Sequence, residues 1–497
     1  MDAARRGQGD GGEHDGRYPE GGNRAGRPGG PARDRGRAGQ EGVPRRQSAR
    51  ESAARTYARA LPIVPVRARG LTVEDADGRR YLDCLSGAGT LALGHNHPVV
   101  LEAIRTVLDS GAPLHVPDLA TPVKDAFVTE LLHTLPPGLA AHARVRFCGP
   151  ADSDAVRAAF RLVRAATGRT GLIAFTRAHQ GASAEVSEAS GDPLDPRITR
   201  LPHPQDYRCP FGVGGPRGAE LAAHWTESVL DGPRPGVPQP AGMILEPVQD
   251  EGGVLPAPDA WLRSMRRITA ERGIPLIVDE THTGVGRTGA LWAVEHSGAT
   301  PDVMVLSKAI GGSLPLAVLV HHEDLGAGQP DTPAGPFRGN QLAMAAGTAT
   351  LAYVRENRLA ERAARLGAHM LTRLRALAGD FPCVGDVRGR GLMIGVELVR
   401  PEEDQGTCGR PVDPGSPTSG TEPQTGRTPR TAAPELAAAV QRACLRRGLI
   451  VDLGGPHANV VRLLPPLTIT DEQAAAVLDR LAEALGAAAG RADARTG

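Results

Sequence analysis

The sequence predicts an α/β protein with a large domain, in which helices cover a mostly parallel sheet, and a smaller α+β domain. The first observation is that short apolar runs alternate with amphipathic helical patterns between residues 116 and 335. The second is that these runs are apolar throughout, which is typical of parallel strands buried on both faces. The third is that residues 336–490 alternate helices with short strands, which favours a smaller α+β domain.

The N-terminal region divides into two parts. Residues 1–50 are rich in Gly and Arg and have few large apolar side chains, so we expect a disordered tail. Residues 51–115 begin an apolar periodicity and form a segment that we expect to join the small domain. The large domain then follows with apolar runs that predict strands at residues 171–175, 241–247, 275–280, 302–308 and 316–322.

The smaller domain has its own succession of patterns. Helical periodicity covers residues 359–377 and 435–447, and an apolar run at 392–398 predicts a strand between them. Residues 401–433 are rich in Pro, Gly, Ser and Thr, so we expect a disordered surface insertion.

Composition excludes several classes of function. The 57 basic and 56 acidic residues leave a formal charge of +1, which argues against a nucleic-acid partner. No apolar run reaches the roughly 18 residues that a membrane span needs, and the N-terminus has no signal-peptide core. The six cysteines form no CxxC pair. We therefore expect a cytoplasmic protein without a membrane partner.

Lys308 is the strongest candidate for a catalytic side chain. It directly follows a buried strand in VLSKAIGG, and Lys124 is the only other lysine in the chain. The carboxyl end of a parallel strand is where α/β proteins bind ligands, and burial there lowers the pKa of an amine and makes it nucleophilic. The alternative is an ordinary surface lysine at a strand end.

Asp279 occupies the equivalent position in PLIVDETHTG, after another apolar run. A carboxylate there can pair with a protonated pyridine nitrogen and keep a pyridoxal ring electron-poor. The alternative is a turn or helix-capping aspartate. A rival motif is GxGxxG, formed by Gly284, Gly286 and Gly289, but no βαβ unit with a following acid supports a nicotinamide site.

From about Glu51 to Leu485 the sequence resembles the class III, fold-type I pyridoxal-phosphate aminotransferases, and within them the diaminobutyrate:2-oxoglutarate branch. The resemblance is carried by ordered stretches, namely ESAARTYAR, YLDCLSGAGTLALGHNHP, FCGPADSDAVRAAFRLVRAATGR, ILEPVQDEGG, DETHTGVGRTG, LSKAIGGSLPLAV, FRGNQLAMAAGTATL, VRGRGLMIGVEL and VVRLLPPLTIT. It implies pyridoxal 5'-phosphate as cofactor. It also implies transfer of a terminal amino group between L-2,4-diaminobutyrate, or a similar ω-amine, and a 2-oxo acid pair such as glutamate and 2-oxoglutarate.

The resemblance also implies roles for single residues. Lys308 would bind the cofactor covalently and shuttle a proton, and Asp279 would hold the pyridine nitrogen. Glu246 and Arg462 are similar to the family's carboxylate and arginine pair, which separates so that the arginine binds a substrate carboxylate. Family members are dimers, so we expect a homodimer whose sites lie at the subunit boundary.

Several family positions at the cofactor carry other residues here. Asp152 and Ser153 replace part of a small triplet that holds the phosphate, and an acid beside a phosphate repels it unless it points away. His179 replaces the aromatic side chain that stacks on the ring, and His282 replaces a glutamine beside it. Pro336 replaces a threonine that binds the partner's phosphate, and proline has no donor.

These departures leave two alternatives to the transaminase. One is a non-catalytic or cofactor-poor homologue that acts as a scaffold. The other is a different pyridoxal-phosphate reaction, catalysed by an aminomutase, racemase or decarboxylase. We predict no metal site, although His95 and His97 have metal-like spacing.

Overall fold

The computed structural model describes residue 50 and residues 61–178, 197–231, 238–326, 336–401 and 429–496. The elements below all belong to one compact unit, residues 52–497. Apart from Arg50, the predicted N-terminal tail lies outside the described residues, as do His179 and most of the predicted insertion.

The centre of the large domain is a seven-stranded sheet with the order β4-β12-β11-β10-β7-β5-β6. β12 runs antiparallel to both of its neighbours, and the remaining strands run in one direction. In sheet order, the strands are β4 (Ala143–Gly149), β12 (Ala317–His322), β11 (Val303–Leu306), β10 (Leu276–Asp279), β7 (Gly242–Leu245), β5 (Leu172–Phe175) and β6 (Ile198–Leu201).

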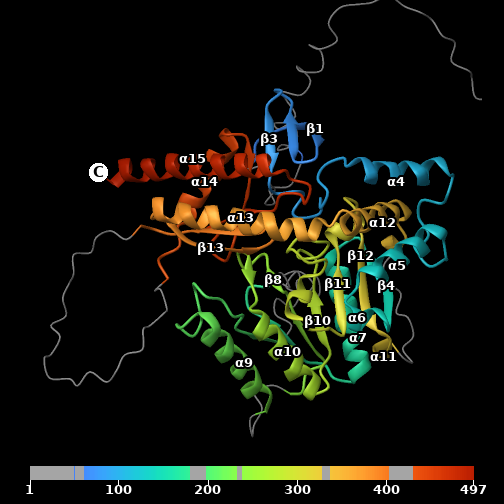
Figure 1. Ribbon diagram of the computed structural model, residues 1–497. Coiled ribbons are helices and arrows are strands. Elements are labelled where there is room, and N and C mark those ends of the chain that lie inside the picture. Colours follow the sequence, from blue (N-terminus) through green and yellow to red (C-terminus); the bar gives the residue numbers. More distant parts are fainter. Residues whose placement is uncertain are drawn as a thin grey trace, which may run out of the picture. The chain divides into compact units, whose positions relative to one another are not determined.

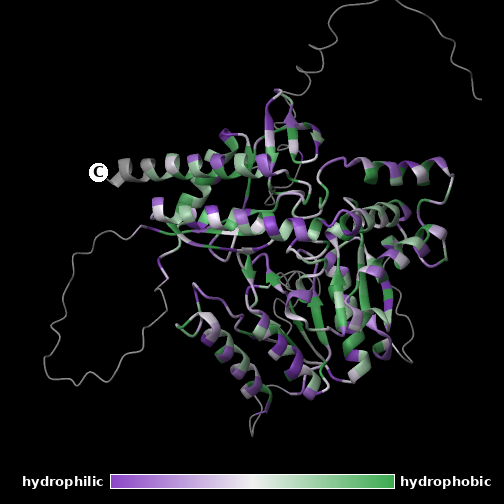
Figure 2. Cartoon of the chain, viewed as in Figure 1, coloured by the Kyte–Doolittle hydropathy of each residue, from purple (hydrophilic) through white to green (hydrophobic). Residues whose placement is uncertain are grey.

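Successive side chains of each strand point to opposite faces, so the apolar runs bury both faces of the sheet. Val303 and Val305 belong to the core on the side of α7 (Asp152–Thr167), and Met304 and Leu306 belong to the core that includes α10 (Asp259–Glu271). Figure 2 shows hydrophobic residues along these strands, whereas the surrounding helices carry both kinds of residue.

Further helices lie before the C-terminal sheet in the chain. α12 begins where the Asn340 side chain accepts a hydrogen bond from the amide of Ala343, at 3.1 Å, which satisfies a free amide of the first turn. α12 packs against α4 and α5. These helices are α4 (Pro98–Asp109), α5 (Pro122–Thr134), α6 (Pro137–Ala140), α9 (Gly215–Asp231), α11 (Glu323–Gly326) and α12 (Gln341–Glu356).

The C-terminal part contains an antiparallel four-stranded sheet with the order β13-β14-β17-β16. Its helices lie together, with α13 beside α15 and α14 packed on α15 (Figure 1). The elements are β13 (Val384–Arg390), β14 (Met393–Leu398), β16 (Asp452–Gly454), β17 (Val460–Leu463), α13 (Leu359–Asp380), α14 (Pro434–Arg446) and α15 (Asp471–Thr496).

Two smaller sheets complete the fold. One has the order β1-β2-β3-β15 and joins three consecutive antiparallel strands near the N-terminus to a strand near the C-terminus, because β15 pairs in parallel with β3. The other is a hairpin of two short strands. The strands are β1 (Pro65–Arg69), β2 (Thr72–Asp75), β3 (Arg80–Asp83), β15 (Leu449–Ile450), β8 (Val248–Gln249) and β9 (Leu255–Pro256).

The predicted α/β fold is confirmed, and the five predicted strands of the large sheet all form. The antiparallel direction of β12 is a feature that the apolar pattern does not encode. Val399 and Ala432 form an isolated β-bridge, so the two ends of the predicted insertion meet. The domain boundaries remain a prediction. Among the described helices, none combines the length and apolar character that crossing a membrane demands.

Candidate active site

Three candidate side chains follow neighbouring parallel strands. Glu246 follows β7, Asp279 ends β10, and Lys308 comes two residues after β11. β10 pairs in parallel with both β7 and β11, so the carboxyl ends of the three strands meet at one edge of the sheet. Glu246 and Asp279 are buried there and Lys308 is half-buried. The sheet therefore brings these three sequence-predicted residues to one edge.

The backbone at Lys308 has an unusual conformation. Lys308 has a φ of 55°, in the left-handed region that lysine rarely adopts, and it begins the 3-10 helix η3 (Lys308–Gly311). Gly312 ends this turn with a φ of 57°, and a Cβ there would lie 2.3 Å from the carbonyl oxygen of Ala346. Only glycine fits at Gly312, so the turn that presents Lys308 depends on it.

The amine of Lys308 contacts a histidine from the neighbouring strand end. Its Nζ lies 2.7 Å from Nε2 of His282 and donates to the carbonyl oxygen of Ala88 at 3.3 Å. Burial lowers the pKa of Lys308, against the opposing negative charges of Asp250, Asp152 and Glu251. A lowered pKa increases the share of neutral amine, which is the nucleophilic form.

His282 is itself held by an acid that the sequence analysis did not single out. Its Nδ1 lies 3.0 Å from Oδ2 of Asp250, and both side chains are buried. Asp250 directly follows β8, in the turn that leads to β9. Burial alone would raise the pKa of Asp250, but His282 and Arg462 outweigh it and hold the pKa well below its usual range.

Arg462 is the only charged residue of β17, and it is buried. A buried guanidinium is costly unless acids surround it. Its Nη1 lies 2.7 Å from Oδ2 of Asp250 and 3.7 Å from Oε1 of Glu251, and its Nη2 binds Asp452. Burial lowers the pKa of Arg462, but the charges of Asp250, Asp452 and Glu251 outweigh this and raise it above its ordinary value.

These ion pairs bear on the carboxylate and arginine pair that the resemblance implies. The resemblance assigns Glu246 to that pair, and in this structure the ion pairs of Arg462 go to Asp250, Glu251 and Asp452. The role of Glu246 stays a prediction. Glu246 lies in the same ILEPVQDEGG stretch as Asp250 and Glu251, and the sequence offered no way to choose among its acids. The β8–β9 turn determines which acids of this stretch pair with Arg462, because it brings the second half of the stretch to that side chain.

The predicted phosphate-binding residues lie at the start of α7. Oδ1 of Asp152 accepts a hydrogen bond from the amide of Ser153 at 2.7 Å, and Oδ2 of Asp154 accepts from the amide of Ala151 at 3.3 Å. A Cβ at Gly149 would lie 2.2 Å from Oδ2 of Asp154, so a larger residue there would force the Asp154 side chain to move. The helix N-terminus favours anions, and acids of its own first turn already bind two of the nearby amides.

Pro336 lies at the start of the 3-10 helix η4 (Pro336–Arg338), where its carbonyl oxygen lies 2.7 Å from Nε2 of His115. His95 binds Asp83 at 2.7 Å, and the ring of His97 packs edge-on against Tyr353. Protein contacts therefore account for the positions of both histidines that have metal-like spacing.

Sequence reasoning missed two residues of this site, Asp250 and Asp452. A signal existed for each of them. Asp250 precedes Glu251 in a stretch that had already been singled out, and Asp452 interrupts the apolar run LIVDL. An acid inside an apolar run needs a buried partner, and the arginine in VVRLLP is the matching charge.

We call the part of the site that contains Lys308, Asp279 and His282 the ring end. Its residues fit the pyridoxal phosphate that the resemblance implies. An amine, a carboxylate and an imidazole lie along one edge of the sheet at Lys308, Asp279 and His282. On the same segments, Oγ1 of Thr281 and Oδ1 of Asp250 are buried without a hydrogen-bond partner among the described residues. Such atoms are normally satisfied, so they indicate a polar group that this site accommodates.

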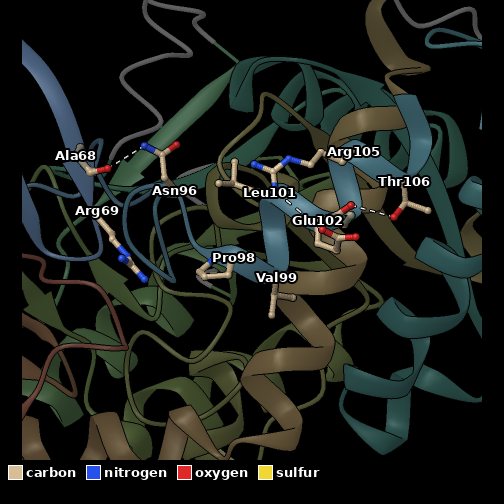
Figure 3. Close-up of a pocket in the computed structure, with 10 residues that line it drawn as sticks. Ala68, Arg69, Asn96, Pro98, Val99, Leu101, Glu102, Arg105 and Thr106 are labelled. Atoms are coloured by element: carbon tan, nitrogen blue, oxygen red, sulfur yellow. Dashed lines mark hydrogen bonds and ion pairs between the residues drawn. The ribbon is translucent and has the colours of Figure 1, made fainter. Parts of the chain in front are cut away.

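An open groove lies elsewhere, between β1 and α4 (Figure 3). Asn96 donates to the carbonyl oxygen of Ala68 across it, and Glu102 and Arg105 supply charges at its wall. None of the sequence-predicted site residues lines this groove. The candidate active site is therefore the edge of the large sheet rather than this groove.

Comparison with known proteins agrees with the geometry. Residues 53–485 match the family model described as "Aminotransferase class-III". The chain is 49% identical over 451 residues to the diaminobutyrate–2-oxoglutarate aminotransferase of Rhizobium meliloti, covering 89% of this chain and 91% of that protein. It is 42% identical to the enzyme of the same name from Haemophilus influenzae, covering 88% of this chain and 94% of that protein.

A solved structure gives the same result. The (S)-enantioselective ω-transaminase of Thermomicrobium roseum superposes with a TM-score of 0.75 at 26% identity, covering 90% of this chain and 98% of that chain. These matches favour the transaminase over the scaffold and over the other pyridoxal-phosphate reactions.

Proposed function

The chain belongs to the class-III aminotransferase family, and on that premise we propose that it moves the terminal amino group of L-2,4-diaminobutyrate, or of a similar ω-amine, to a 2-oxo acid such as 2-oxoglutarate. The protein is a pyridoxal-phosphate-dependent aminotransferase that acts on a small amino donor and a 2-oxo acid acceptor. The substrate proposal rests on the two relatives of 42–49% identity that carry this name.

The observation that carries the residue assignment is the contact of Lys308 Nζ with His282 Nε2 at the carboxyl edge of the sheet. When bound, pyridoxal phosphate supplies an aldehyde that condenses with amines and an electron-poor ring that accepts electrons from the substrate carbon. Lys308 would bind that aldehyde through its amine, and Asp279 would hold the ring nitrogen in its protonated form. His282 lies beside Lys308 and would bind the polar edge of the ring.

Lys308 also moves the proton of the reaction. With its amine free, Nζ of Lys308 would take a proton from the substrate carbon and give it back. Its lowered pKa supports this role, because an amine that loses its proton more readily can act as a base closer to neutral pH. Ser153 and the first amides of α7 would bind the phosphate, with His179 as the proposed ring-stacking residue.

Arg462 binds the carboxylate of each substrate. A guanidinium binds a carboxylate through two parallel hydrogen bonds, which fixes the substrate's orientation. Support comes from its present partners, which are carboxylates, namely Asp250, Asp452 and Glu251. Glu251 lies at 3.7 Å and is half exposed, and it shares Nη1 of Arg462 with Asp250, so a substrate carboxylate that binds Nη1 competes with both acids. Glu246 stays a candidate substrate-binding residue because it is buried directly after β7, at the same edge of the sheet.

We propose a homodimer. Large apolar side chains are exposed on neighbouring segments, with Leu119 at 70% and Phe337 at 66% exposure, and Leu114 lies on the same segment as Leu119. The amide of Val116 binds the carbonyl oxygen of Gly339 at 2.9 Å, which ties these segments together. Exposed apolar side chains that gather in this way are typical of an interface. Light scattering of the purified protein tests this, and a monomer would contradict it.

We also propose a cytoplasmic protein. Cys84, Cys148, Cys383 and Cys444 are free thiols buried in the core, which is typical of proteins from a reducing compartment. Fractionation of cells tests this, with recovery outside the cytoplasm as the contrary result.

Replacing the only two lysines one at a time tests the assignment of Lys308. Lys308→Ala should abolish transfer from L-2,4-diaminobutyrate to 2-oxoglutarate, because it removes the nucleophile and the base together. Lys124→Arg, on α5, keeps a cation where the amine now lies over the ring of Phe147, so it should keep activity within about twofold. Borohydride reduction should trap the cofactor on the Lys308 peptide alone. Cofactor trapped on the Lys124 peptide, or full turnover by Lys308→Ala, would refute the assignment.

A further inference from the structure

A continuous chain of contacts joins Lys308 to Arg462. Nζ of Lys308 lies 2.7 Å from Nε2 of His282, and Nδ1 of His282 lies 3.0 Å from Oδ2 of Asp250. The same Oδ2 accepts from Nη1 of Arg462 at 2.7 Å. One carboxylate oxygen therefore serves both the histidine beside the lysine and the arginine that we assign to the substrate carboxylate.

We propose that Asp250 is a positioning residue that orients His282 against Lys308 and couples that orientation to the occupancy of Arg462. The inference rests on the proposed roles of Lys308 and Arg462 in the transamination. In this proposal Asp250 contacts neither the substrate nor the cofactor. It acts through His282 and Arg462, the two side chains that contact its Oδ2.

The orientation of His282 follows from what each group can donate. A carboxylate only accepts hydrogen bonds, so Nδ1 of His282 carries the hydrogen that Asp250 receives. In the neutral imidazole this leaves a lone pair on Nε2, which accepts a hydrogen from the amine of Lys308. Asp250 thus selects the tautomer and the ring direction that allow His282 to contact Lys308.

Asp250 is well placed to hold that direction. Its side chain is buried, and its carbonyl oxygen accepts from the amides of Gly253 at 2.9 Å and Val254 at 3.3 Å. These bonds close the turn between β8 and β9 and fix the Asp250 backbone. Arg462 has a second buried acid, Asp452, on the neighbouring strand β16. Arg462 therefore stays anchored when its contact with Asp250 changes.

The shared oxygen has a consequence for proton transfer. When a substrate carboxylate draws Nη1 of Arg462 away, the charge of Asp250 acts on His282 alone and favours the imidazolium. A proton can then leave Nζ of Lys308, where an N–H bond breaks, and bind Nε2 of His282, where an N–H bond forms. The products are a neutral lysine amine and an imidazolium paired with Asp250, so charge is conserved and no other reactant is needed.

The groups that act on the Lys308 amine come from several elements. They are His282 after β10, the carbonyl oxygen of Ala88, and the charges of Asp250, Asp152, Glu251 and Arg462. Removing the negative charge of Asp250 removes the largest of the charges that favour the ammonium. The pKa of Lys308 should therefore fall when Asp250 is neutralised.

Nuclear magnetic resonance of the full-length, cofactor-free protein, labelled with 13C and 15N in lysine, tests this coupling without turnover. The chain has two lysines, so Lys124 is an internal control for Lys308 in every pH titration. Asp250→Asn should lower the Lys308 midpoint by roughly one pH unit, the scale of one nearby charge, and leave Lys124 unchanged. An unchanged Lys308 midpoint would overturn the proposal.

Asp452→Asn is the matched control. It removes a buried acid that pairs with Nη2 of Arg462, whereas Asp250 pairs with both Arg462 and His282, so it should raise KM for the 2-oxo acid and shift the Lys308 midpoint by less than about 0.3 pH unit. Equal shifts in Asp250→Asn and Asp452→Asn would contradict a specific role for Asp250.

A double-variant cycle separates positioning from general damage. If Asp250 acts through His282, Asp250→Asn should lower kcat about tenfold in the native background and less than about twofold in a His282→Gln background. Additive losses would refute the proposal. Asp250→Glu keeps the charge and moves the carboxylate, so it decides the question if Asp250→Asn fails to fold. It should keep the Lys308 midpoint and lower kcat, and an unchanged kcat would count against the proposal.

The two proposals can fail separately. The lysine titration needs no substrate, so an unchanged midpoint contradicts the positioning role of Asp250 whatever the enzyme transfers. Failure to use diamino acids contradicts the proposed substrate and leaves the titration result as it stands.

Discussion

The two ends of the proposed cofactor site are organised in opposite ways. At the ring end, Lys308, His282, Asp250 and Arg462 form a chain of contacts that joins four different segments. At the phosphate end, the acids at the start of α7 bind amides of their own turn. The first arrangement couples distant segments, and the second is local.

This difference indicates which end of the site can contribute more free energy to cofactor binding. At the ring end, a charged group of the ligand can pair with a buried side chain or take the place of one of its partners, so that no buried charge is left unpaired. At the phosphate end, Asp152 already occupies the amide of Ser153, so a phosphate must displace an acid of the same charge. We therefore expect the ring end to dominate both binding and chemistry, and the following variants test that expectation.

The largest effect should come from Asp279, which tests the dominance of the ring end. Asp279→Asn removes the charge that keeps the ring nitrogen protonated, so kcat should fall at least about 100-fold, the scale of losing one electrostatic stabiliser. The measurement is steady-state kcat with saturating cofactor. Asp259→Asn, whose acid pairs with Arg390 outside the site, is the control. Similar losses in the two variants would show that Asp279 has no special role.

Arg462 should have the next largest effect. Arg462→Gln leaves Asp250 and Asp452 buried without their cation, and it removes the carboxylate-binding group. Losing one partner of a buried ion pair costs about 3 kcal/mol, which corresponds to roughly a 100-fold rise in KM for 2-oxoglutarate. Initial rates over a range of 2-oxoglutarate concentrations measure this, and a KM that stays at the native value would remove Arg462 from the substrate site.

Asp152 tests the phosphate end directly, and here the expected change is a gain. Asp152→Ala removes a negative charge and frees the amide of Ser153, so cofactor affinity should increase about tenfold. Asp152→Asn removes the charge but keeps an oxygen for the same amide, so its gain should be smaller. Fluorescence titration with pyridoxal phosphate compares the two. Weaker binding in both variants would mean that Asp152 supports the cofactor.

The smallest effect concerns pH. Lysine is charged below its pKa, and burial lowers the pKa of Lys308, so the neutral amine that captures the cofactor forms at a lower pH than in a free lysine. Capture should therefore accelerate as pH rises and level off above the lowered pKa. Because Asp152 supports the ammonium, Asp152→Asn should move this midpoint down by a few tenths of a pH unit. Stopped-flow capture rates measure it, and an upward shift would contradict the sign.

Sequence reasoning found the residues whose position follows from a single strand. Lys308 and Asp279 stand at the ends of apolar runs, and the parallel arrangement of those runs placed both at one edge. The roles of His282 and Arg462 came only from the resemblance. The antiparallel β12 was missed, because apolar runs do not record direction.

The pairing of charges could not be read from the sequence. Arg462 lies 212 residues from Asp250, and three acids of the ILEPVQDEGG stretch were possible partners. The choice depends on how the β8–β9 turn meets β17, which is a tertiary contact. The resemblance alone singled out Glu246, whereas the ion pairs of Arg462 in the structure go to Asp250, Glu251 and Asp452.

The amino-donor half of the reaction tests the central claim most directly. Protein loaded with pyridoxal phosphate is mixed with L-2,4-diaminobutyrate in the absence of any 2-oxo acid, and its absorbance is followed. The account predicts that the visible band of the lysine-bound cofactor disappears and that the near-ultraviolet band of the amine form replaces it, with 2-oxoglutarate restoring the visible band. A visible band that persists at saturating L-2,4-diaminobutyrate would contradict the proposed function.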